Sequence, residues 1–140
     1  MVLKNIAHSR PFLGEAEAAA IRTGHIAQGK SVSEFERSIA GLSNRRYAAA
    51  TSSGTAALHL TLLAMGICEG DEVILPSFVC SALLNAVRYT AAYPVLADID
   101  PHSFNIDPQD AAQRITSRTR AIIAPHLFGR PADLEGLLAL

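Results

Sequence analysis

The sequence of 140 residues contains little of what several protein classes require. Its two cysteines, Cys68 and Cys80, are too few for a disulfide scaffold and do not have the spacing of a zinc site. Twelve Lys and Arg residues face thirteen Asp and Glu residues, and the net charge of −1 gives no basic footprint for nucleic acid or an anionic membrane. These counts predict no metal site, no nucleic-acid partner and a reducing, cytoplasmic setting.

Long apolar runs are also missing. The longest one, 73–87, is interrupted by Pro76, Ser77, Ser81 and Asn85, so it does not predict a membrane span. The first ten residues lack the apolar core of a signal peptide. With 49% hydrophobic residues the chain is not a disordered tail, and its length allows one domain with a real core.

The clearest functional signal is a junction between a short apolar run, 47–50, and a helix-forming segment near Gly54. The first turn of a helix has backbone N–H groups without partners and the positive end of the helix dipole, so it attracts anions. We therefore predict phosphate binding by the backbone at Gly54, with a hydroxyl from Ser53 or Thr55. An ordinary capped helix is the alternative interpretation of these residues.

From residue 47 onward, short apolar runs alternate with segments of helical spacing. Because the runs are apolar without alternation, they are typical of a parallel sheet covered by helices on both faces. Asp107 and Pro108 form a helix-start signal, with Asp as the N-cap and Pro at the first position. Strands are predicted at 47–50, 72–75, 94–97 and 120–124, and helices at 55–65, 81–90, 108–114 and 133–140.

The first 46 residues have no strand pattern. Helices are predicted at 15–23 and 33–40, the second with a capping box from Ser31 to Glu34. We therefore divide the chain into an N-terminal helical segment, 1–46, and the first four β-α units of a larger domain, 47–140. Because the last residues form an apolar helix without a cap, we expect a truncated chain.

Many short blocks of this sequence, in this order, resemble the N-terminal third of the DegT/DnrJ/StrS family of sugar aminotransferases. Each block alone is unspecific, but their combination is specific. The matching blocks are RPFLG at 10–14, AQG at 27–29, EFE at 34–36, SGTAAL at 53–58, GDEVI at 70–74, PSF at 76–78, NAV at 85–87, PV at 94–95, DIDP at 98–101, FNIDP at 104–108, IT at 115–116, TRAII at 119–123, HLFG at 126–129 and PAD at 131–133.

The resemblance implies a three-layer α/β/α domain with a mostly parallel sheet, of the aspartate aminotransferase-like fold type I, incomplete in this chain. It implies pyridoxal 5'-phosphate (PLP) as cofactor and a cytoplasmic homodimer without nucleic-acid or membrane partners. The implied reaction moves an amino group from glutamate to a nucleotide-linked keto-sugar, in polysaccharide or secondary-metabolite sugar biosynthesis. The implied cofactor-binding residues are Ser53, Gly54, Thr55 and Ala56 for the phosphate and Phe78 for stacking on the pyridine ring.

Two features depart from the family pattern: the residues after Phe78, and the segment 15–24, which is roughly one helical turn shorter than is common in the family. Val79 and Cys80 follow Phe78, where many members have Thr and an aromatic residue, so Phe78 is the nearby ring that remains for stacking. The Schiff-base lysine and the aspartate under the pyridine nitrogen lie, in relatives, beyond position 140, and neither Lys4 nor Lys30 is a plausible substitute. We therefore assign no catalytic residue and expect this chain alone to be inactive, with weak or no PLP binding.

Two other functions remain as alternatives. One is a non-catalytic split or degenerate relative that acts by binding a partner chain through an exposed sheet edge. The other is a small phosphate- or nucleotide-binding domain of the doubly wound class. A longer reading frame with a lysine segment would favour the enzyme, and nucleotide binding without PLP binding would favour the small domain.

Several other side chains have both a functional and a plain structural interpretation. His126 follows the fourth predicted strand, where ligands gather in open α/β sheets, and is either near the cofactor or a hydrogen-bonded structural residue. Arg10 either approaches the substrate or forms a surface ion pair.

Asp98 and Asp100 are expected to serve turns and caps, and Cys80 to be buried and unreactive. Glu34 and Glu36 are expected to favour a helix dipole, and Phe78 is alternatively a core residue. His59 lies inside its predicted helix and is expected to serve packing or to lie at the surface.

Overall fold

The computed structural model describes residues 14–24 and 27–140. The chain separates into two compact units, Met1–Ala50 and Thr51–Leu140. Each unit is described by itself, because each has its own internal packing.

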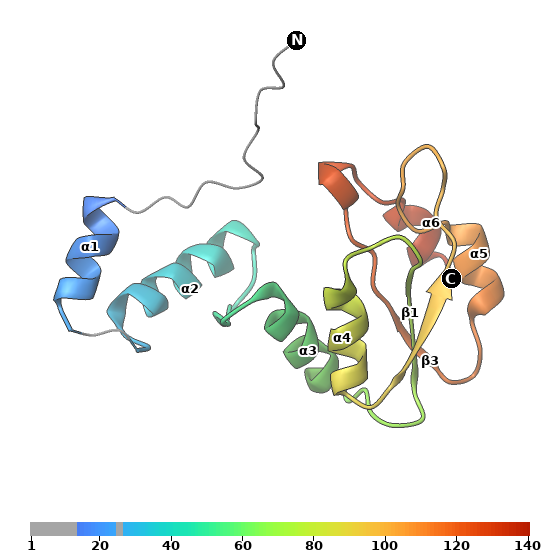
Figure 1. Cartoon of the computed structure of the whole chain (residues 1–140), viewed down its shortest axis with the longest axis horizontal. Helices are drawn as coiled ribbons and strands as arrows, with labels where there is room; N and C mark the ends of the chain where they lie inside the picture. The colour runs from blue at the N-terminus through green and yellow to red at the C-terminus, as the bar shows by residue number, and fades with distance from the viewer. Residues whose placement is uncertain (1–13, 25–26) are drawn as a thin grey trace, which may run out of the picture. The chain divides into compact units, whose positions relative to one another are not determined.

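The unit Met1–Ala50 contains two helices, α1 (Glu15–Arg22) and α2 (Lys30–Leu42) (Figure 1). Both predicted helices are confirmed. The predicted capping box at Ser31 is wrong, because α2 begins directly after its N-cap Gly29 and Ser31 therefore lies inside the first turn. A glutamate does reach back to an N-cap in α1, where Gly14 N–H donates to Glu17 Oε2 at 2.8 Å.

The early start of α2 also changes the roles of its two glutamates. Neither lies in the first turn, so the predicted dipole role is wrong for both. Glu34 lies 3.8 Å from Lys30 in an exposed i,i+4 ion pair. Glu36 Oε1 accepts the backbone N–H of Ala50 at 2.8 Å and so anchors the segment that follows α2.

The strand predicted at 47–50 is not formed. These residues have no regular structure, and Tyr47 is 75% exposed with the Arg46 guanidinium 5.1 Å from its ring centre. An apolar run becomes a strand only where a neighbouring strand accepts and donates its backbone hydrogen bonds. None of the described segments pairs with 47–50, so the run stays irregular.

The unit Thr51–Leu140 is built on a three-stranded parallel sheet. Its strands are β1 (Glu72–Pro76), β2 (Tyr93–Ala97) and β3 (Thr119–Ile122), in the order β2-β1-β3. All five residues of the central β1 are buried, which is why the four after Glu72 are apolar without alternation. Pro94 lies in β2, which is an edge strand of the sheet. Its lack of a backbone N–H therefore interrupts no hydrogen-bond ladder between central strands.

The helices of this unit form where the sequence predicts them, although the first of them follows no strand among the described residues. They are α3 (Gly54–Ala64), α4 (Ser81–Tyr89), α5 (Pro108–Arg114) and α6 (Leu134–Leu138), with a 3₁₀ turn at Leu127–Gly129. The start signal at Asp107 is confirmed, since its Oδ1 accepts the N–H of Gln109 at 2.9 Å. Gly66, with φ of +78°, ends α3 in the left-handed conformation that glycine adopts without strain.

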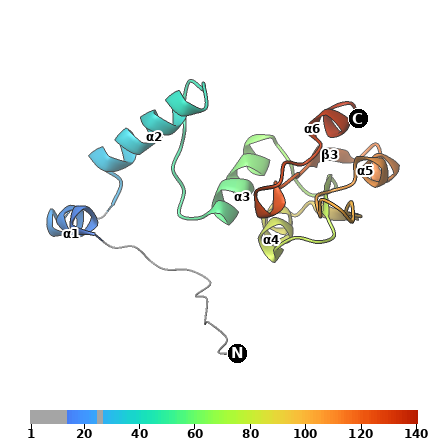
Figure 2. The ribbon, with the colours of Figure 1, turned by 90° about the horizontal axis from the view of Figure 1, so that it is seen from above.

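Alternate residues of β1 face two separate cores. Val73 and Leu75 pack with Leu62 of α3 and with Leu83 and Val87 of α4. Ile74 points to the other face, where Ala97, Ile106, Ala111 and Leu137 surround it. Figure 2 shows α3 and α4 on one side of the sheet and α5 and α6 on the other. The predicted three-layer α/β/α arrangement of a partial fold type I domain is therefore confirmed within this unit.

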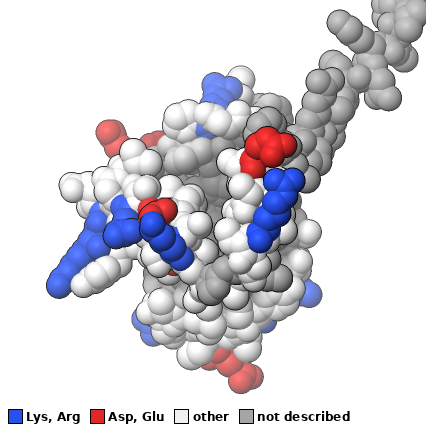
Figure 3. Space-filling model, turned by 90° about the vertical axis from the view of Figure 1, so that its left-hand side faces the viewer, with Lys and Arg blue, Asp and Glu red and all other residues white. Residues whose placement is uncertain are grey.

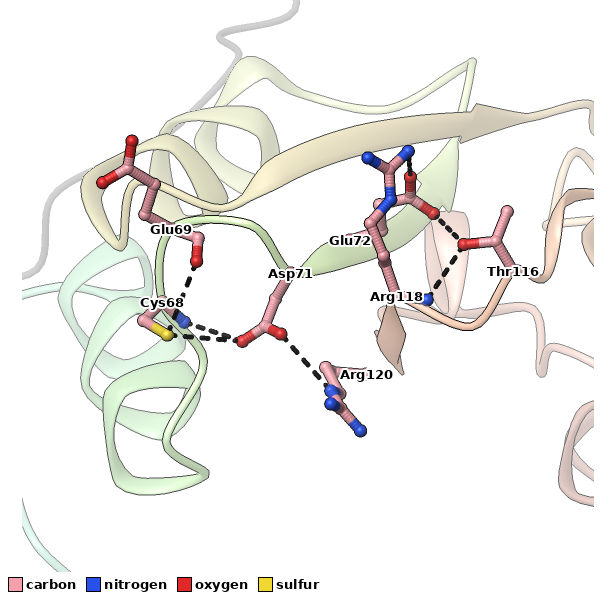
Figure 4. A network of polar contacts seen from close by, with 7 residues as sticks. All are labelled: Cys68, Glu69, Asp71, Glu72, Thr116, Arg118 and Arg120. Atoms are coloured by element: carbon pink, nitrogen blue, oxygen red, sulfur yellow. Dashed lines mark hydrogen bonds and ion pairs between the residues drawn. The ribbon is translucent and has the colours of Figure 1, made fainter.

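A polar network ties the amino ends of β1 and β3 together (Figure 4). Glu72 has a side chain only 5% exposed; its Oε2 accepts the hydroxyl of Thr116 at 2.6 Å, and its Oε1 pairs with Arg118. The hydroxyl of Thr116, and then the charge of Arg118, hold the pKa of Glu72 below its ordinary value of 4.5.

Asp71 completes this network beside a bulge in β3. Glu72 pairs with Thr119 and Val73 with Ala121, so Arg120 is the extra residue of the bulge. The Arg120 guanidinium lies 3.3 Å from Asp71, whose other oxygen accepts the N–H of Cys68 at 3.0 Å. That N–H is the largest cause of the lowered pKa of Asp71. The network joins strand starts and lies at the edge opposite to the strand ends.

Within the described residues, no helix is long and apolar enough to cross a membrane, and no group of His, Cys, Asp and Glu could hold a metal ion. On the face drawn in Figure 3, Lys and Arg side chains and Asp and Glu side chains stand among uncharged surface. Neither basic nor acidic side chains cover that face, in agreement with the net charge of −1.

Candidate functional site

The predicted anion-binding junction folds as a capped helix start. Ser53, the N-cap of α3, has extended backbone angles, and its Oγ accepts the N–H of Ala56 at 3.1 Å. The carbonyl of Ser53 accepts the N–H of Ala57 at 3.0 Å and the hydroxyl of Thr51 at 3.0 Å. The Ser53 side chain therefore satisfies one of the four N–H groups that a helix start leaves without intrahelical partners, and its carbonyl accepts the first backbone hydrogen bond of the helix.

The N–H groups of Gly54 and Thr55 are also among these four, and neither has an acceptor among the described residues. Gly54 is exposed and Thr55 half-buried, so water or a ligand can reach this turn. The sequence analysis grouped Ala56 with these two residues, but the N–H of Ala56 is already taken by Ser53. Two adjacent donors at the positive end of an 11-residue helix form a place that suits a phosphate.

Gly54 leaves this place open. A Cβ built on Gly54 would meet no atom within 4 Å, and its φ is not in the left-handed region. The residue is therefore not required by the turn itself. Its lack of a side chain lets another group come close to the backbone of the turn.

The segments after the carboxyl ends of the three strands carry two of the predicted residues, together with Phe104, which was not predicted. Phe78 follows β1, the loop after β2 carries Phe104, and His126 follows β3. The rings of Phe78 and Phe104 lie 6.0 Å apart at an angle of 49°, with the two residues 50% and 46% exposed. The interpretation of Phe78 as a core residue is therefore wrong, and the ring is available for contact with a ligand.

The ring of His126 is held by a hydrogen bond from a backbone N–H. Its Nδ1 accepts the N–H of Ala132 at 2.9 Å, while the residue itself is exposed. The predicted structural hydrogen bond is thus present, and the other ring nitrogen, Nε2, has no partner among the residues that the structure describes. Arg10, the other predicted near-site residue, lies outside the described residues.

The aspartates after β2 serve turns, as predicted. Asp100 Oδ1 accepts the N–H groups of His102 at 3.1 Å and Ser103 at 2.6 Å, and the N–H of Ser103 is the main cause of the lowered pKa of Asp100. The carbonyl of Asp98 accepts the N–H of Asp107 at 2.9 Å. The Asp100 carboxylate thus holds the loop, whereas Asp98 contributes to it through its backbone N–H and carbonyl.

Three further residues complete the account. Cys80 is exposed and free, so its predicted burial is wrong; it lies at the N-cap of α4, at the surface. His59 packs edge-on against Tyr89 with ring centres 5.5 Å apart, which confirms its packing role. The sequence analysis missed Asn105, which is 2% exposed and links two loops at the strand ends. Its only signal was its place in the block FNIDP.

Known proteins resemble this chain in sequence and in fold. A profile of the DegT/DnrJ/EryC1/StrS aminotransferase family matches residues 12–140. GDP-perosamine synthase of Escherichia coli O157:H7 is 42% identical over 113 residues, which are 81% of this chain and 31% of that protein.

Solved structures are similar over most of this chain. The putative sugar aminotransferase Spr1654 from Streptococcus pneumoniae, in its PLP form, has a TM-score of 0.89 at 30% identity and covers 97% of this chain. NtdA from Bacillus subtilis with bound PMP has a TM-score of 0.82 at 36% identity and covers 88%. This chain covers 36% and 28% of those two chains, so it spans about a third of the length of the relatives it matches.

Proposed function

Because this chain belongs to the DegT/DnrJ/EryC1/StrS aminotransferase family, we propose that it forms the phosphate-binding part of an enzyme that aminates a nucleotide-linked keto-sugar. PLP is the cofactor of the family, and similar structures are known in PLP and PMP forms. The observation that carries the proposal is the pair of unpartnered N–H groups of Gly54 and Thr55, at the start of a helix within the family match.

The residues of this turn fit the phosphate of PLP. An anion there meets two backbone donors and the helix dipole, and the missing side chain of Gly54 removes the main obstacle to close approach. The hydroxyl of Thr55 adds a donor in the same turn, while Ser53 keeps the turn in shape through Ala56. No described basic side chain is required for this mode of binding, which fits the scarcity of lysine.

The strand ends supply the next contacts in this proposal. Phe78 places its half-exposed ring against the pyridine ring of the cofactor, and the ring of Phe104 packs beside the ring of Phe78. His126 offers its Nε2 near the cofactor. When bound, PLP supplies an electron sink that lets the amino group move between donor and acceptor. In this proposal Gly54, Thr55, Phe78 and His126 bind and orient PLP.

We propose that neither lysine of this sequence forms the Schiff base. Lys30 has a side chain 89% exposed and pairs with Glu34 within α2, and Lys4 lies outside the described residues. We also propose glutamate as amino donor, a nucleotide-linked keto-sugar as acceptor, a homodimer and a cytoplasmic location. The name of the relative GDP-perosamine synthase supports the substrate class.

The test is intact mass of the protein as its gene encodes it, after PLP is added and the imine is reduced with borohydride. We expect one phosphopyridoxyl group on a lysine other than Lys4 and Lys30, located by peptide mapping. An adduct confined to Lys4 or Lys30, or no adduct at all, would contradict the proposal. Absence of an adduct together with tight association with a second chain would instead favour a non-catalytic binding role.

A further inference from the structure

Asn105 is the most buried polar side chain near the strand ends. The residue is 2% exposed and lies in the loop between β2 and α5. Its Oδ1 accepts the N–H of Leu127 at 2.9 Å, and its Nδ2 donates to the carbonyls of Arg130 and Pro131, each at 3.0 Å. All three partners belong to the segment after β3, so this one side chain joins the loops that follow two different strands.

The chemistry of these three contacts requires an amide. Two carbonyl oxygens need a donor and one N–H needs an acceptor, and the primary amide of asparagine offers both in one plane. An aspartate could still accept from Leu127, but it would place a carboxylate oxygen against the carbonyls of Arg130 and Pro131. The loss would be large because the group is buried, where an unsatisfied or repelled polar atom is most costly.

The loop that carries Asn105 is itself rigid. The N–H of Asp100 donates to the carbonyl of Asn105 at 2.9 Å, and Ile99 and Ile106 form an antiparallel bridge. Phe104, directly before Asn105, has φ of +61°, a left-handed conformation that a bulky residue adopts only where its surroundings impose it. Asn105 therefore has a fixed backbone position, and its side chain holds the loop that follows β3.

The second loop folds around His126. The segment from His126 to Ala132 begins with a 3₁₀ turn, and within it Phe128 is also left-handed, with φ of +53°. His126 Nδ1 accepts the N–H of Ala132, and the Arg130 guanidinium donates to the carbonyl of His102, which gives a second tie to the β2–α5 loop. The three bonds of Asn105 lie between the two ends of this turn and hold them in register.

The bond to Ala132 determines which ring nitrogen carries the proton. A nitrogen that accepts an N–H has no proton of its own, so the neutral imidazole of His126 carries its proton on Nε2. That nitrogen has no partner among the described residues, and His126 is exposed at the carboxyl edge of the sheet. The ring is thus oriented with a free N–H donor on its outer side.

We propose that Asn105 is a positioning residue that locks the turn from His126 to Ala132, and so holds His126 as the Nε2–H tautomer, a hydrogen-bond donor toward an acceptor atom of the ligand. The ligand contact rests on the proposed function; the lock on the tautomer does not. Asn105 itself touches no ligand in this proposal and acts through His126.

The test compares Asn105→Asp with the matched control Asn85→Asp in the protein as its gene encodes it. Asn85 is exposed on α4, so the control makes the same chemical change where no side-chain contact is lost. The readout is the pair of ring ¹⁵N chemical shifts of His126, at about pH 8 where an imidazole is neutral. The signals are assigned by their loss in His126→Gln.

We expect the wild-type and Asn85→Asp proteins to show a protonated Nε2 and an unprotonated Nδ1, and Asn105→Asp to show an averaged pair from mixed tautomers. A protonated Nδ1 in the wild type would overturn the proposal, and this result needs no variant to fold. An unchanged pair of shifts in a folded Asn105→Asp protein would overturn it as well.

A PLP titration of the same three proteins separates the two proposals. If His126 donates to the ligand, Asn105→Asp weakens PLP binding by the factor by which the Nε2–H fraction falls, about twofold for an even mixture of the two tautomers. Wild-type protein that binds no PLP would contradict the proposed function. The ring ¹⁵N shifts would still test whether Asn105 holds His126 as the Nε2–H tautomer. Mixed tautomers with unchanged PLP affinity would overturn the ligand contact of His126.

Discussion

Thr116 Oγ1 lies 2.6 Å from Glu72 Oε2, a hydrogen bond between residues 44 positions apart in the sequence. The bond joins the start of β1 to the turn that leads into β3, and Arg118 pairs with the second oxygen of the same carboxylate. This contact lies at the amino edge of the sheet, whereas Phe78 and His126 lie after the carboxyl ends of the strands. Stability and candidate function are thus assigned to opposite edges of one small sheet.

Glu72→Gln should make the stability of the protein less dependent on acid pH. Because the pKa of Glu72 is lowered in the folded state, its ionised form stabilises the fold above about pH 4.5, and this contribution is lost as the pH falls through the lower folded value. The wild type should therefore exceed Glu72→Gln in urea midpoint at pH 7, and the difference should shrink below pH 4.5. Glu69→Gln, exposed three positions before β1, is the control and should change the midpoint at neither pH. A constant difference across this range would contradict the prediction.

Ser53→Ala should destabilise the start of α3. The Ser53 hydroxyl oxygen is the acceptor for the N–H of Ala56, and loss of such an N-cap costs about 1 kcal/mol. Urea unfolding measures this change. Ser52→Ala, at an exposed neighbouring position that forms no such bond, should stay within about 0.5 kcal/mol of the wild type. Equal losses in the two variants would argue against the cap.

Gly54→Ala should separate stability from phosphate binding. Its Cβ meets no atom within 4 Å, so the variant should fold and gain up to about 1 kcal/mol from the better helix former. The same methyl group would stand where a phosphate approaches the Gly54 and Thr55 N–H groups, so the Kd for PLP should rise. The control is Gly41→Ala, inside α2 and also with open space around the new Cβ. It should gain similar stability and leave PLP affinity unchanged; weaker binding in both variants would contradict a specific site at Gly54.

Phe78→Ala should weaken PLP binding with little effect on folding. Phe78 is 50% exposed, so its removal should cost far less than the roughly 2–5 kcal/mol expected for Leu75→Ala in the core, where Leu75 is 1% exposed. The expected signature is a higher Kd together with a shifted absorption band of bound PLP, since the ring no longer stacks. Phe35→Ala, which removes a ring 56% exposed on α2, is the control. If Phe78→Ala bound PLP as the wild type does, Phe78 would not contact the cofactor.

Local signals in the sequence predicted most of the elements. The apolar runs at 72–75 and 94–97 became β1 and β2, and Asp107 with Pro108 began α5, because propensity and capping act within a few residues. The same reasoning failed at 47–50 and at Ser31. A strand needs a partner far along the chain, and α2 has its N-cap at Gly29, two residues before the predicted cap Ser31.

The sequence by itself determined the family, the parallel sheet and the turn from Ser53 to Thr55, because these depend on ordered motifs and on periodicity. Only the tertiary structure decided which N–H groups of that turn stay unpartnered, that Phe78 is exposed beside Phe104, and that Asn105 joins two loops. Such contacts join segments up to 26 residues apart, as between Asn105 and Pro131. The physical reason is that hydrogen bonds and ring contacts are decided by positions in space, which a local pattern of residues does not contain.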